Sequence, residues 1–198
     1  MQIIEASRAP VVASHVGMRA LCDNPANLSD DVLRALAAKN GLVGIVASAD
    51  YISQPYFDWS RTHPPVPVNG VTRAQVFSAE LPKVRSPNQD YGEYIDALDA
   101  LMGGLWRRYY GQPWKDTPEA ENLVPSAEQW ADHVAHAIAL AGPTRVAIGL
   151  DEAHGKSMLK NIDASGYPLL VEALSKRKIS SQVHGENWLR ILDAAKVQ

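Results

Sequence analysis

The sequence predicts an α/β fold built on a parallel sheet, and two features carry this prediction: three short apolar runs and the helical patterns between them. The runs cover residues 10–15, 42–47 and 145–151. Apolar runs without strict alternation are typical of parallel strands that are buried on both faces. A helical pattern joins the first two runs, and strand, helix and strand at this spacing form a βαβ unit.

Helix start and stop signals place the helices along the chain. Ser29 is a favourable N-cap residue, two aspartates follow it where carboxylates favour the helix dipole, and Gly41 ends the pattern. Residues 126–129 (Ser-Ala-Glu-Gln) form a capping box that opens a later helix. The helices expected around the sheet cover residues 30–40, 126–141, 168–178 and 180–195.

We expect residues 1–198 to form one domain that contains an excursion over residues 53–125. A chain of this length with 46% hydrophobic residues can bury one core. Six prolines between residues 53 and 87 exclude long regular elements there, and a helix is expected over 90–110. The excursion is expected to form a lid or a subunit interface.

Composition excludes several classes of function. The formal net charge is −3 and no basic stripe is present, so nucleic acid is not an expected partner. Cys22 is the single cysteine, which excludes an internal disulfide. The longest apolar helical stretch, 94–110, carries four charged residues, so no transmembrane segment is expected. No secretory signal opens the sequence, which leaves the location unknown, with the cytoplasm as the default expectation.

Two strand ends carry residues suited to catalysis. His15 ends the first predicted strand and Asp151 ends the third, and the carboxyl ends of parallel strands share the edge where α/β enzymes bind ligands. A neutral imidazole is a good zinc ligand, and a carboxylate can accept a proton from water and return it to a leaving amine. Such residues also cap loops, so the pair by itself leaves a structural role open.

Three segments resemble one known family. Residues 11–15 (Val-Val-Ala-Ser-His), 20–27 (Ala-Leu-Cys-Asp-Asn-Pro-Ala-Asn) and 30–34 (Asp-Asp-Val-Leu-Arg) resemble the C-terminal half of the membrane (renal) dipeptidases, dizinc peptidases of the amidohydrolase-like barrel class. In that family a strand ending in Ser-His precedes an Ala-Leu-Cys-Asp-His-Pro-Arg-Asn loop and an Asp-Asp-Val-Leu-Arg helix. Residues 183–191 also resemble the end of the family, where they look like a helix-packing feature. The resemblance implies a partial (β/α)8 TIM barrel: the last three βα units plus the helical and loop excursion.

The resemblance also implies a site. By position, His15 corresponds to the second of two zinc-binding histidines on successive strands, Asp151 to an aspartate that shuttles the proton, and Tyr51 to a tyrosine near the substrate. The implied cofactor is zinc, with two ions in the family, and the implied substrate is a dipeptide or a related small molecule. The implied function is a zinc-dependent dipeptidase-like hydrolase that cleaves dipeptides with a metal-activated water.

The sequence departs from the family pattern around this site. The family loop carries an arginine that pairs with the substrate carboxylate, and Ala26 stands at that position. The family's His-x-Asp pair, bridging glutamate and earlier strand histidine have no counterpart, whereas a zinc site needs three or four protein ligands. We therefore expect the chain alone to lack a complete metal site. Three situations fit the sequence: a complementary chain completes the barrel, further copies of this chain complete it, or the chain is a degenerate relative that folds as an open sheet.

Two other functions stay open at this point. A non-catalytic binding or assembly module derived from the same scaffold would explain Ala26 and the missing ligands. A different amidohydrolase activity, such as that of a lactonase or a deaminase, would keep the metal chemistry and change the substrate. The sequence leaves the substrate, its stereochemistry and the oligomeric state undetermined.

The remaining histidines and the cysteine are given structural interpretations where the sequence favours them. His133 and His136 share a helix face, but the helix has its own amphipathic pattern and the family carries a similar pair that does not bind metal. His154, three residues after Asp151, is a candidate extra ligand or base. Cys22 is expected to be a small buried side chain rather than a nucleophile.

Overall fold

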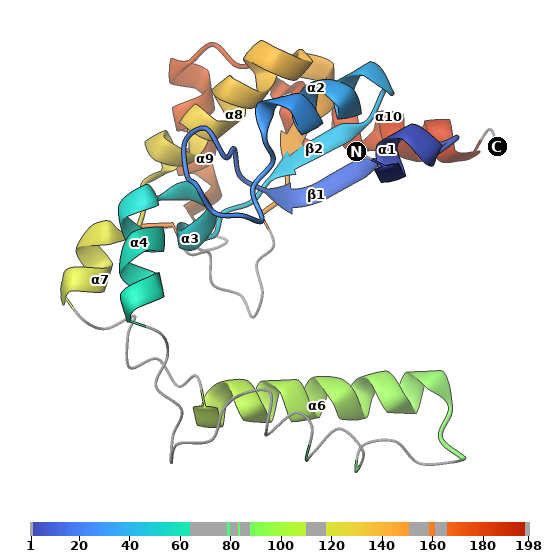
Figure 1. The fold of residues 1–198 in the computed structure, drawn as a ribbon, viewed down its shortest axis with the longest axis vertical. Coiled ribbons are helices and arrows are strands. Elements are labelled where there is room, and N and C mark those ends of the chain that lie inside the picture. Colours follow the sequence, from blue (N-terminus) through green and yellow to red (C-terminus); the bar gives the residue numbers. More distant parts are fainter. Residues whose placement is uncertain are drawn as a thin grey trace. The chain divides into compact units, whose positions relative to one another are not determined.

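The computed structural model describes residues 2–63, 79, 83, 88–109, 118–150, 159–160 and 166–196, with no side-chain description for 102–109 and 196. The chain forms two compact units, one made of residues 1–61 and 121–198 and the other of residues 62–120. The first unit holds the sheet. The second contains α6 (Tyr91–Tyr109), the helix expected over 90–110, and it lies within the predicted excursion (Figure 1).

The sheet of the first unit has three parallel strands in the order β1-β2-β3, as Figure 1 shows. The strands are β1 (Val12–Val16), β2 (Leu42–Ile45) and β3 (Val146–Ile148). Every residue of β2 is buried, as expected for a central strand covered on both faces. The predicted α/β class and its parallel sheet are confirmed, and three such strands are consistent with part of a barrel.

An irregularity in β1 sets the close packing of the sheet. The pairing register between β1 and β2 shifts between Ala13 and Val16, so Ser14 and His15 lie in a bulge. A Cβ atom added to Gly44 would lie 2.2 Å from the carbonyl oxygen of Ser14, and one added to Gly149 would lie 2.1 Å from the same atom. Only glycine fits at these two positions, because the bulge brings the Ser14 carbonyl against their backbones.

The expected helices follow the predicted order, and two short helices that were not predicted, α1 (Gln2–Ala6) and α7 (Pro118–Leu123), are added. Two further differences concern the chain after β2 and the end of the sequence. The chain after β2 stays helical where irregular structure was expected, because Pro55 stands in the first turn of α4, where a proline costs no helical hydrogen bond. The helix expected over 180–195 is interrupted at Gly185 and becomes a short 3₁₀ turn, η5 (Ser181–His184), followed by α10. The helices besides α6 are α1 (Gln2–Ala6), α2 (Asp30–Ala38), α3 (Ala49–Ile52), α4 (Gln54–Thr62), α7 (Pro118–Leu123), α8 (Ala127–Ala141), α9 (Tyr167–Lys176) and α10 (Glu186–Lys196), and a second 3₁₀ turn is η2 (Pro143–Arg145).

The predicted capping signals differ in outcome. Ser126 forms the expected capping box, since its hydroxyl accepts from the Gln129 amide at 3.3 Å and the Gln129 side chain accepts from the Ser126 amide at 3.0 Å. Ser29 is the N-cap residue of α2, but its side chain forms no cap hydrogen bond with any described residue. Of the helices that the structure describes, none combines the length and apolar character that crossing a membrane requires.

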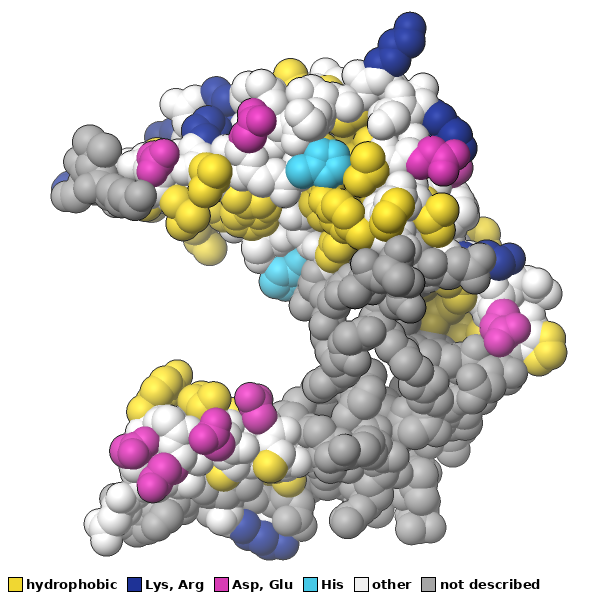
Figure 2. Space-filling view, turned by 180° about the vertical axis from the view of Figure 1, so that it is seen from behind, with side chains coloured by type: hydrophobic (Ala, Val, Ile, Leu, Met, Phe, Trp, Pro, Cys, Tyr) yellow, Lys and Arg dark blue, Asp and Glu magenta, His cyan; other side chains and the backbone are white. Residues whose placement is uncertain are grey.

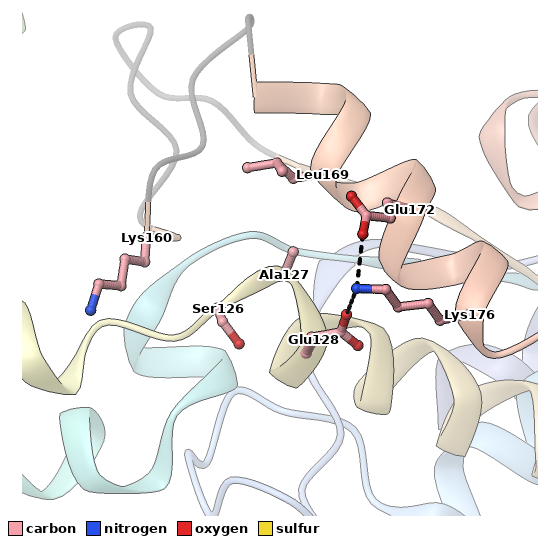
Figure 3. Close-up of a pocket in the computed structure, with 7 residues that line it drawn as sticks. All are labelled: Ser126, Ala127, Glu128, Lys160, Leu169, Glu172 and Lys176. Carbon is pink, nitrogen blue, oxygen red and sulfur yellow. Dashed lines mark hydrogen bonds and ion pairs between the residues drawn. The ribbon is translucent and has the colours of Figure 1, made fainter.

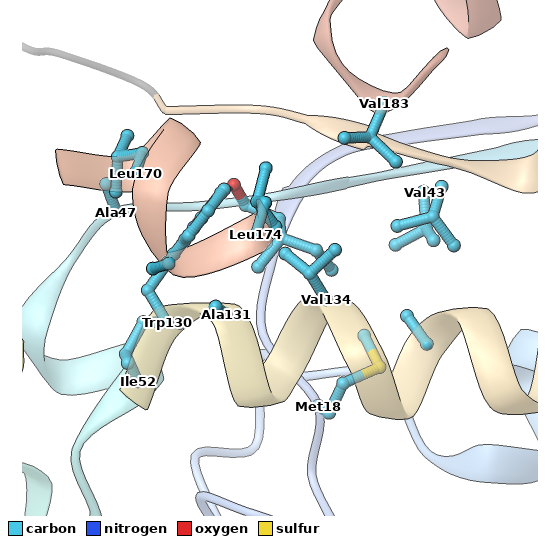
Figure 4. Packing of buried hydrophobic residues seen from close by; sticks show 14 of the residues in the cluster. Met18, Val43, Ala47, Ile52, Trp130, Ala131, Val134, Leu170, Leu174 and Val183 are labelled. Carbon is cyan, nitrogen blue, oxygen red and sulfur yellow. The ribbon is translucent and has the colours of Figure 1, made fainter. Parts of the chain in front are cut away.

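Helix α8 is the centre of the packing, because it contacts the sheet as well as α2 and α9. Its indole at Trp130 is fully buried and donates to the carbonyl oxygen of Ile45, at the end of β2, at 3.3 Å. Figure 4 shows this face of α8 against the strands and α9. The buried residues in this cluster include Met18, Val43, Ile52, Trp130, Ala131, Val134, Leu170, Leu174 and Val183.

The closing segment fastens the ends of two strands. The Asn187 side chain donates to the carbonyl oxygen of Val146 at 2.7 Å, and the Trp188 indole donates to that of the last residue of β3 at 2.9 Å. Arg190 donates to the carbonyl oxygen of Gly41, just before β2, at 3.2 Å. These contacts explain the sequence pattern of this segment as a packing feature.

Apolar side chains also remain on the surface of the first unit. Figure 2 shows hydrophobic side chains gathered on one of its faces. Ile3, Leu189 and Leu192 are large apolar residues with 76%, 61% and 56% of their surface exposed. Gathered apolar surface of this kind is typical of regions that contact another molecule or chain.

We expect the substitution Gly44→Ala to lower the free energy of unfolding by roughly 2 kcal/mol or more, because the new methyl group has no space beside the Ser14 carbonyl. Urea unfolding followed by tryptophan fluorescence measures this loss. Gly185→Ala is the control in the same unit, since no described atom lies within 4 Å of its added Cβ. Equal stability of the two variants would contradict the close packing at the bulge.

Candidate functional site

His15 lies at the carboxyl end of β1 with its side chain exposed. Its Nδ1 atom is 2.7 Å from the hydroxyl oxygen of Ser14, and no described residue forms a hydrogen bond with Nε2. Bulges often re-aim a side chain at a sheet edge, and a hydroxyl at Nδ1 orients the ring. The geometry thus presents Nε2 as an available nitrogen donor, with Nδ1–H donating to Ser14 in the matching tautomer.

Asp151 and His154 lie outside the described residues. The described chain after β3 continues through Leu150, whose carbonyl oxygen accepts from the amide of Ala47 at 3.3 Å. The carbonyl oxygen of Val16, next to His15, accepts from the amide of Val46 at 3.1 Å. The immediate neighbours of both predicted site residues are therefore held by consecutive residues at the end of β2. The convergence of the two side chains stays a prediction.

Tyr51 lies in α3, the short helix that follows β2, and is half-buried. Its carbonyl oxygen accepts from the side-chain amide of Asn27 at 2.8 Å. The Asn27 oxygen in turn accepts from the amide of Gly17 at 2.7 Å, and its nitrogen also donates to the carbonyl oxygen of Cys22 at 2.9 Å. Asn27 is buried, so one side chain ties the loop after β1 to the helix that carries Tyr51.

His133 makes a second tie of the same kind. The buried ring accepts from the amide of Met18 at Nδ1, at 2.9 Å, and donates from Nε2 to the carbonyl oxygen of Ile52 at 3.1 Å. Burial lowers the pKa of His133 from 6.5 to about 4, so the ring is neutral at physiological pH. Both nitrogens are occupied, which supports the structural interpretation. His136 likewise bonds to Asp30 through Nε2 at 2.9 Å.

The loop that carries Ala26 is closed by its own contacts. The amide of Ala26 donates to the side chain of Asn24 at 2.9 Å, and its side chain is exposed. Arg19 donates to the carbonyl oxygen of Pro25 at 2.5 Å, so a guanidinium lies beside the position where the family has arginine. Cys22 is fully buried, and burial raises the pKa of its thiol, so it is the inert small side chain that the sequence predicts.

A cavity of about 240 Å³ lies between the start of α8 and α9 (Figure 3). The ammonium of Lys176 lies 3.1 Å from a carboxylate oxygen of Glu128 and 2.9 Å from one of Glu172. Arg177 and Lys176 lower the pKa of Glu128 through their hydrogen bonds to it. The lining of this cavity contains none of the predicted site residues. It consists of Ser126, Ala127, Glu128, Lys160, Leu169, Glu172 and Lys176.

The fit to a metal ion rests on one side chain. No group of three or more histidine, cysteine, aspartate or glutamate side chains gathers in a metal-binding arrangement within the part of the chain that the structure describes. His15 supplies one exposed nitrogen with an orienting hydroxyl behind it. An exposed imidazole nitrogen is a type of donor that zinc accepts.

Comparisons with known proteins agree with the fold. Dipeptidase 3 of Macaca fascicularis and that of Rattus norvegicus are 45% and 47% identical to this chain over 47 residues, which is 24% of this chain and 10% of each relative. The structure of the probable dipeptidase PvdM from Pseudomonas aeruginosa matches 96% of this chain with a TM-score of 0.56 and 24% identity. A metallo peptidase from Rhodobacter sphaeroides, liganded with a phosphinate mimic of the dipeptide L-Ala-D-Ala, matches 97% of it with a TM-score of 0.56 and 17% identity.

This chain covers only part of those proteins, namely 46% of the Pseudomonas structure and 38% of the Rhodobacter structure. The matches to the two structures concern the fold. The family model described as "Membrane dipeptidase (Peptidase family M19)" matches residues 1–198, which is the full sequence given. The chain therefore belongs to the membrane dipeptidase family, peptidase family M19.

Proposed function

We propose that this chain forms part of the active site of a zinc-dependent dipeptidase. In this proposal His15 binds one metal ion through Nε2, Asp151 transfers the proton during peptide-bond cleavage, and Tyr51 lies beside the substrate. Family membership supports the reaction class, and the liganded Rhodobacter structure supports a dipeptide as the substrate class. The comparisons favour neither a non-catalytic module nor another amidohydrolase activity.

One observation carries the proposal: the two residues that directly follow β2 hold the backbone beside His15 and the backbone beside Asp151. The residue after His15 and the residue before Asp151 bond to the adjacent amides of Val46 and Ala47. Val46 and Ala47 directly follow β2, so the backbones beside His15 and Asp151 are held at the same edge of the sheet. This arrangement supports a shared site at the carboxyl edge of the sheet, which is where such folds bind substrates.

The residues of this chain have distinct roles in the proposed reaction. Ser14 orients the imidazole of His15, and His15 holds a metal ion. A bound zinc ion would supply Lewis acidity and a water of lowered pKa. Asp151 accepts a proton from the attacking water, holds it, and returns it to the leaving amine. Ala26 provides no guanidinium for the substrate carboxylate, so recognition of that group falls to other residues.

The same proposal includes a partner, either a complementary chain or a further copy of this one. Strands β1 and β3 are the outer strands of the sheet, and unpaired strand edges tend to pair with other chains. The exposed apolar side chains of α1 and α10 support such a contact. A partner of this kind would contribute the metal ligands that the described residues do not supply.

We expect His15→Ala to weaken Zn²⁺ binding at least tenfold, because it removes the nitrogen donor. Isothermal titration of the full chain with Zn²⁺ measures the change. His184→Ala is the matched control, since the Nδ1 atom of His184 also lies beside a hydroxyl, 2.7 Å from that of Tyr167. Unchanged affinity in His15→Ala, or an equal loss in His184→Ala, would contradict the assignment of His15.

We expect Asp151→Asn to lower the zinc-dependent rate of L-Ala-D-Ala hydrolysis by about 10²–10⁴, because an amide cannot carry the proton. Release of D-Ala measures this rate. The comparison uses the chain together with the partner that completes its metal site, because the chain alone is expected to show little or no hydrolysis. Glu152→Gln is the control for loss of a carboxylate at the neighbouring position. Full activity of Asp151→Asn would overturn the role of Asp151.

A further inference from the structure

We propose that His133 and Asn27 form a paired clamp that positions the chain after His15 against the helix that carries Tyr51. His133 is then a positioning residue of the site, although it touches neither metal nor substrate. The significance of His15 and Tyr51 rests on the proposed function. The clamp itself rests on hydrogen bonds, burial and close packing.

The two side chains bridge the same two segments at adjacent positions. Asn27 links the amide of Gly17 to the carbonyl oxygen of Tyr51, with distances of 2.7 and 2.8 Å. His133 makes the next link along both segments, from the amide of Met18 to the carbonyl oxygen of Ile52, with distances of 2.9 and 3.1 Å. Consecutive amides on one segment therefore face consecutive carbonyls on the other, and one side chain connects each pair.

Close packing between the two segments is an independent observation. A Cβ atom added to Gly17 would lie 2.5 Å from the carbonyl oxygen of Tyr51 and 2.6 Å from the side-chain oxygen of Asn27. The segments therefore approach so closely that the position two residues after His15 accepts only glycine. Hydrogen bonds and packing together fix their separation.

The chemistry of the clamp requires one donor and one acceptor on each bridging side chain. A neutral imidazole offers an acceptor on one side and a donor on the other, as does a carboxamide. The bridged backbone groups are buried, since Met18 is fully buried and Ile52 has 3% of its surface exposed. An apolar replacement of His133 would leave both groups without a partner and without water.

Helix α8 anchors the clamp to the sheet. His133 lies between the fully buried Trp130 and Val134, and the Trp130 indole bonds to the carbonyl oxygen of Ile45. We therefore expect α8 to keep its position when a clamp residue is replaced. The loop after β1 is the part free to shift, and any effect on His15 passes through Val16, whose carbonyl oxygen the amide of Val46 holds.

The clamp predicts a pH dependence of stability. The pKa of His133 is about 4 in the folded state and 6.5 in the unfolded state. Between pH 4 and pH 6.5 the unfolded state therefore binds more protons than the folded state. Stability is fully present above pH 6.5 and falls as the pH drops toward 4, by up to about tenfold per unit in the unfolding equilibrium constant. Asp132 opposes the lowering of the pKa, and His136, paired with Asp30 of α2, adds to it. His133→Gln should remove this part of the slope in urea titrations, and an unchanged slope would contradict it.

Amide hydrogen exchange tests the clamp directly. His133→Leu should raise the exchange rate of the Met18 amide at least tenfold, while the Val43 amide in β2 changes far less. His133→Gln, which keeps a donor and an acceptor, should stay within about threefold of the wild type. His136→Gln, on the same helix, is the matched control. An unchanged Met18 amide in His133→Leu, or an equal rise at every amide, overturns the proposal.

Zn²⁺ affinity tests whether the clamp positions the site. His133→Leu should weaken Zn²⁺ binding roughly tenfold, and His133→Gln should restore it. Loss of Met18 protection with wild-type Zn²⁺ affinity would show a structural role alone and would overturn the positioning role. If wild type and His15→Ala bind Zn²⁺ equally, the proposed function fails, and the positioning role fails with it. The exchange rates then still decide whether the clamp exists.

Discussion

The pairing of buried backbone groups just beyond the sheet is the constraint on which the rest of this structure depends. Gly17 and Met18 stay buried where the chain leaves β1, and although this segment forms a parallel bridge with Leu28, the amides of both residues bond to side chains. Each buried amide or carbonyl left without a partner costs about 1–3 kcal/mol. Asn27 and His133 supply these partners from a loop and from α8. These bonds hold the chain that follows His15, while the pairing of β1 with β2 holds His15 itself.

The features around His15 depend on one another. The bulge in β1 exposes the imidazole and pushes the Ser14 carbonyl against two glycines, and the clamp begins two residues later. The closing helix bonds to the first and the last residue of β3. A rigid sheet edge of this kind is what a metal ligand needs, because small displacements of a ligand weaken binding. Because the chain belongs to the membrane dipeptidase family, we propose that this geometry serves metal binding.

The sequence predicted the regular elements because their signals are local. The apolar runs, the capping box at Ser126 and the burial of Cys22 all depend on residues close in the chain. The clamp could not be predicted from the sequence, because His133 and Met18 are 115 positions apart and no local pattern pairs an imidazole with a distant amide. The helix after Ser53 and the break at Gly185 were missed because turn signals compete with helical ones. Asp151 lies outside the described residues, so its placement stays a prediction.

A double-mutant cycle tests the central claim most directly, namely that two side chains distant in the chain act as one device. The cycle compares Asn27→Ala, His133→Leu and the double variant by urea unfolding. Because both side chains join the same two segments, releasing one should weaken the other. The account predicts a coupling energy of at least about 0.5 kcal/mol. Additive effects within about 0.3 kcal/mol would show two independent contacts and would contradict it.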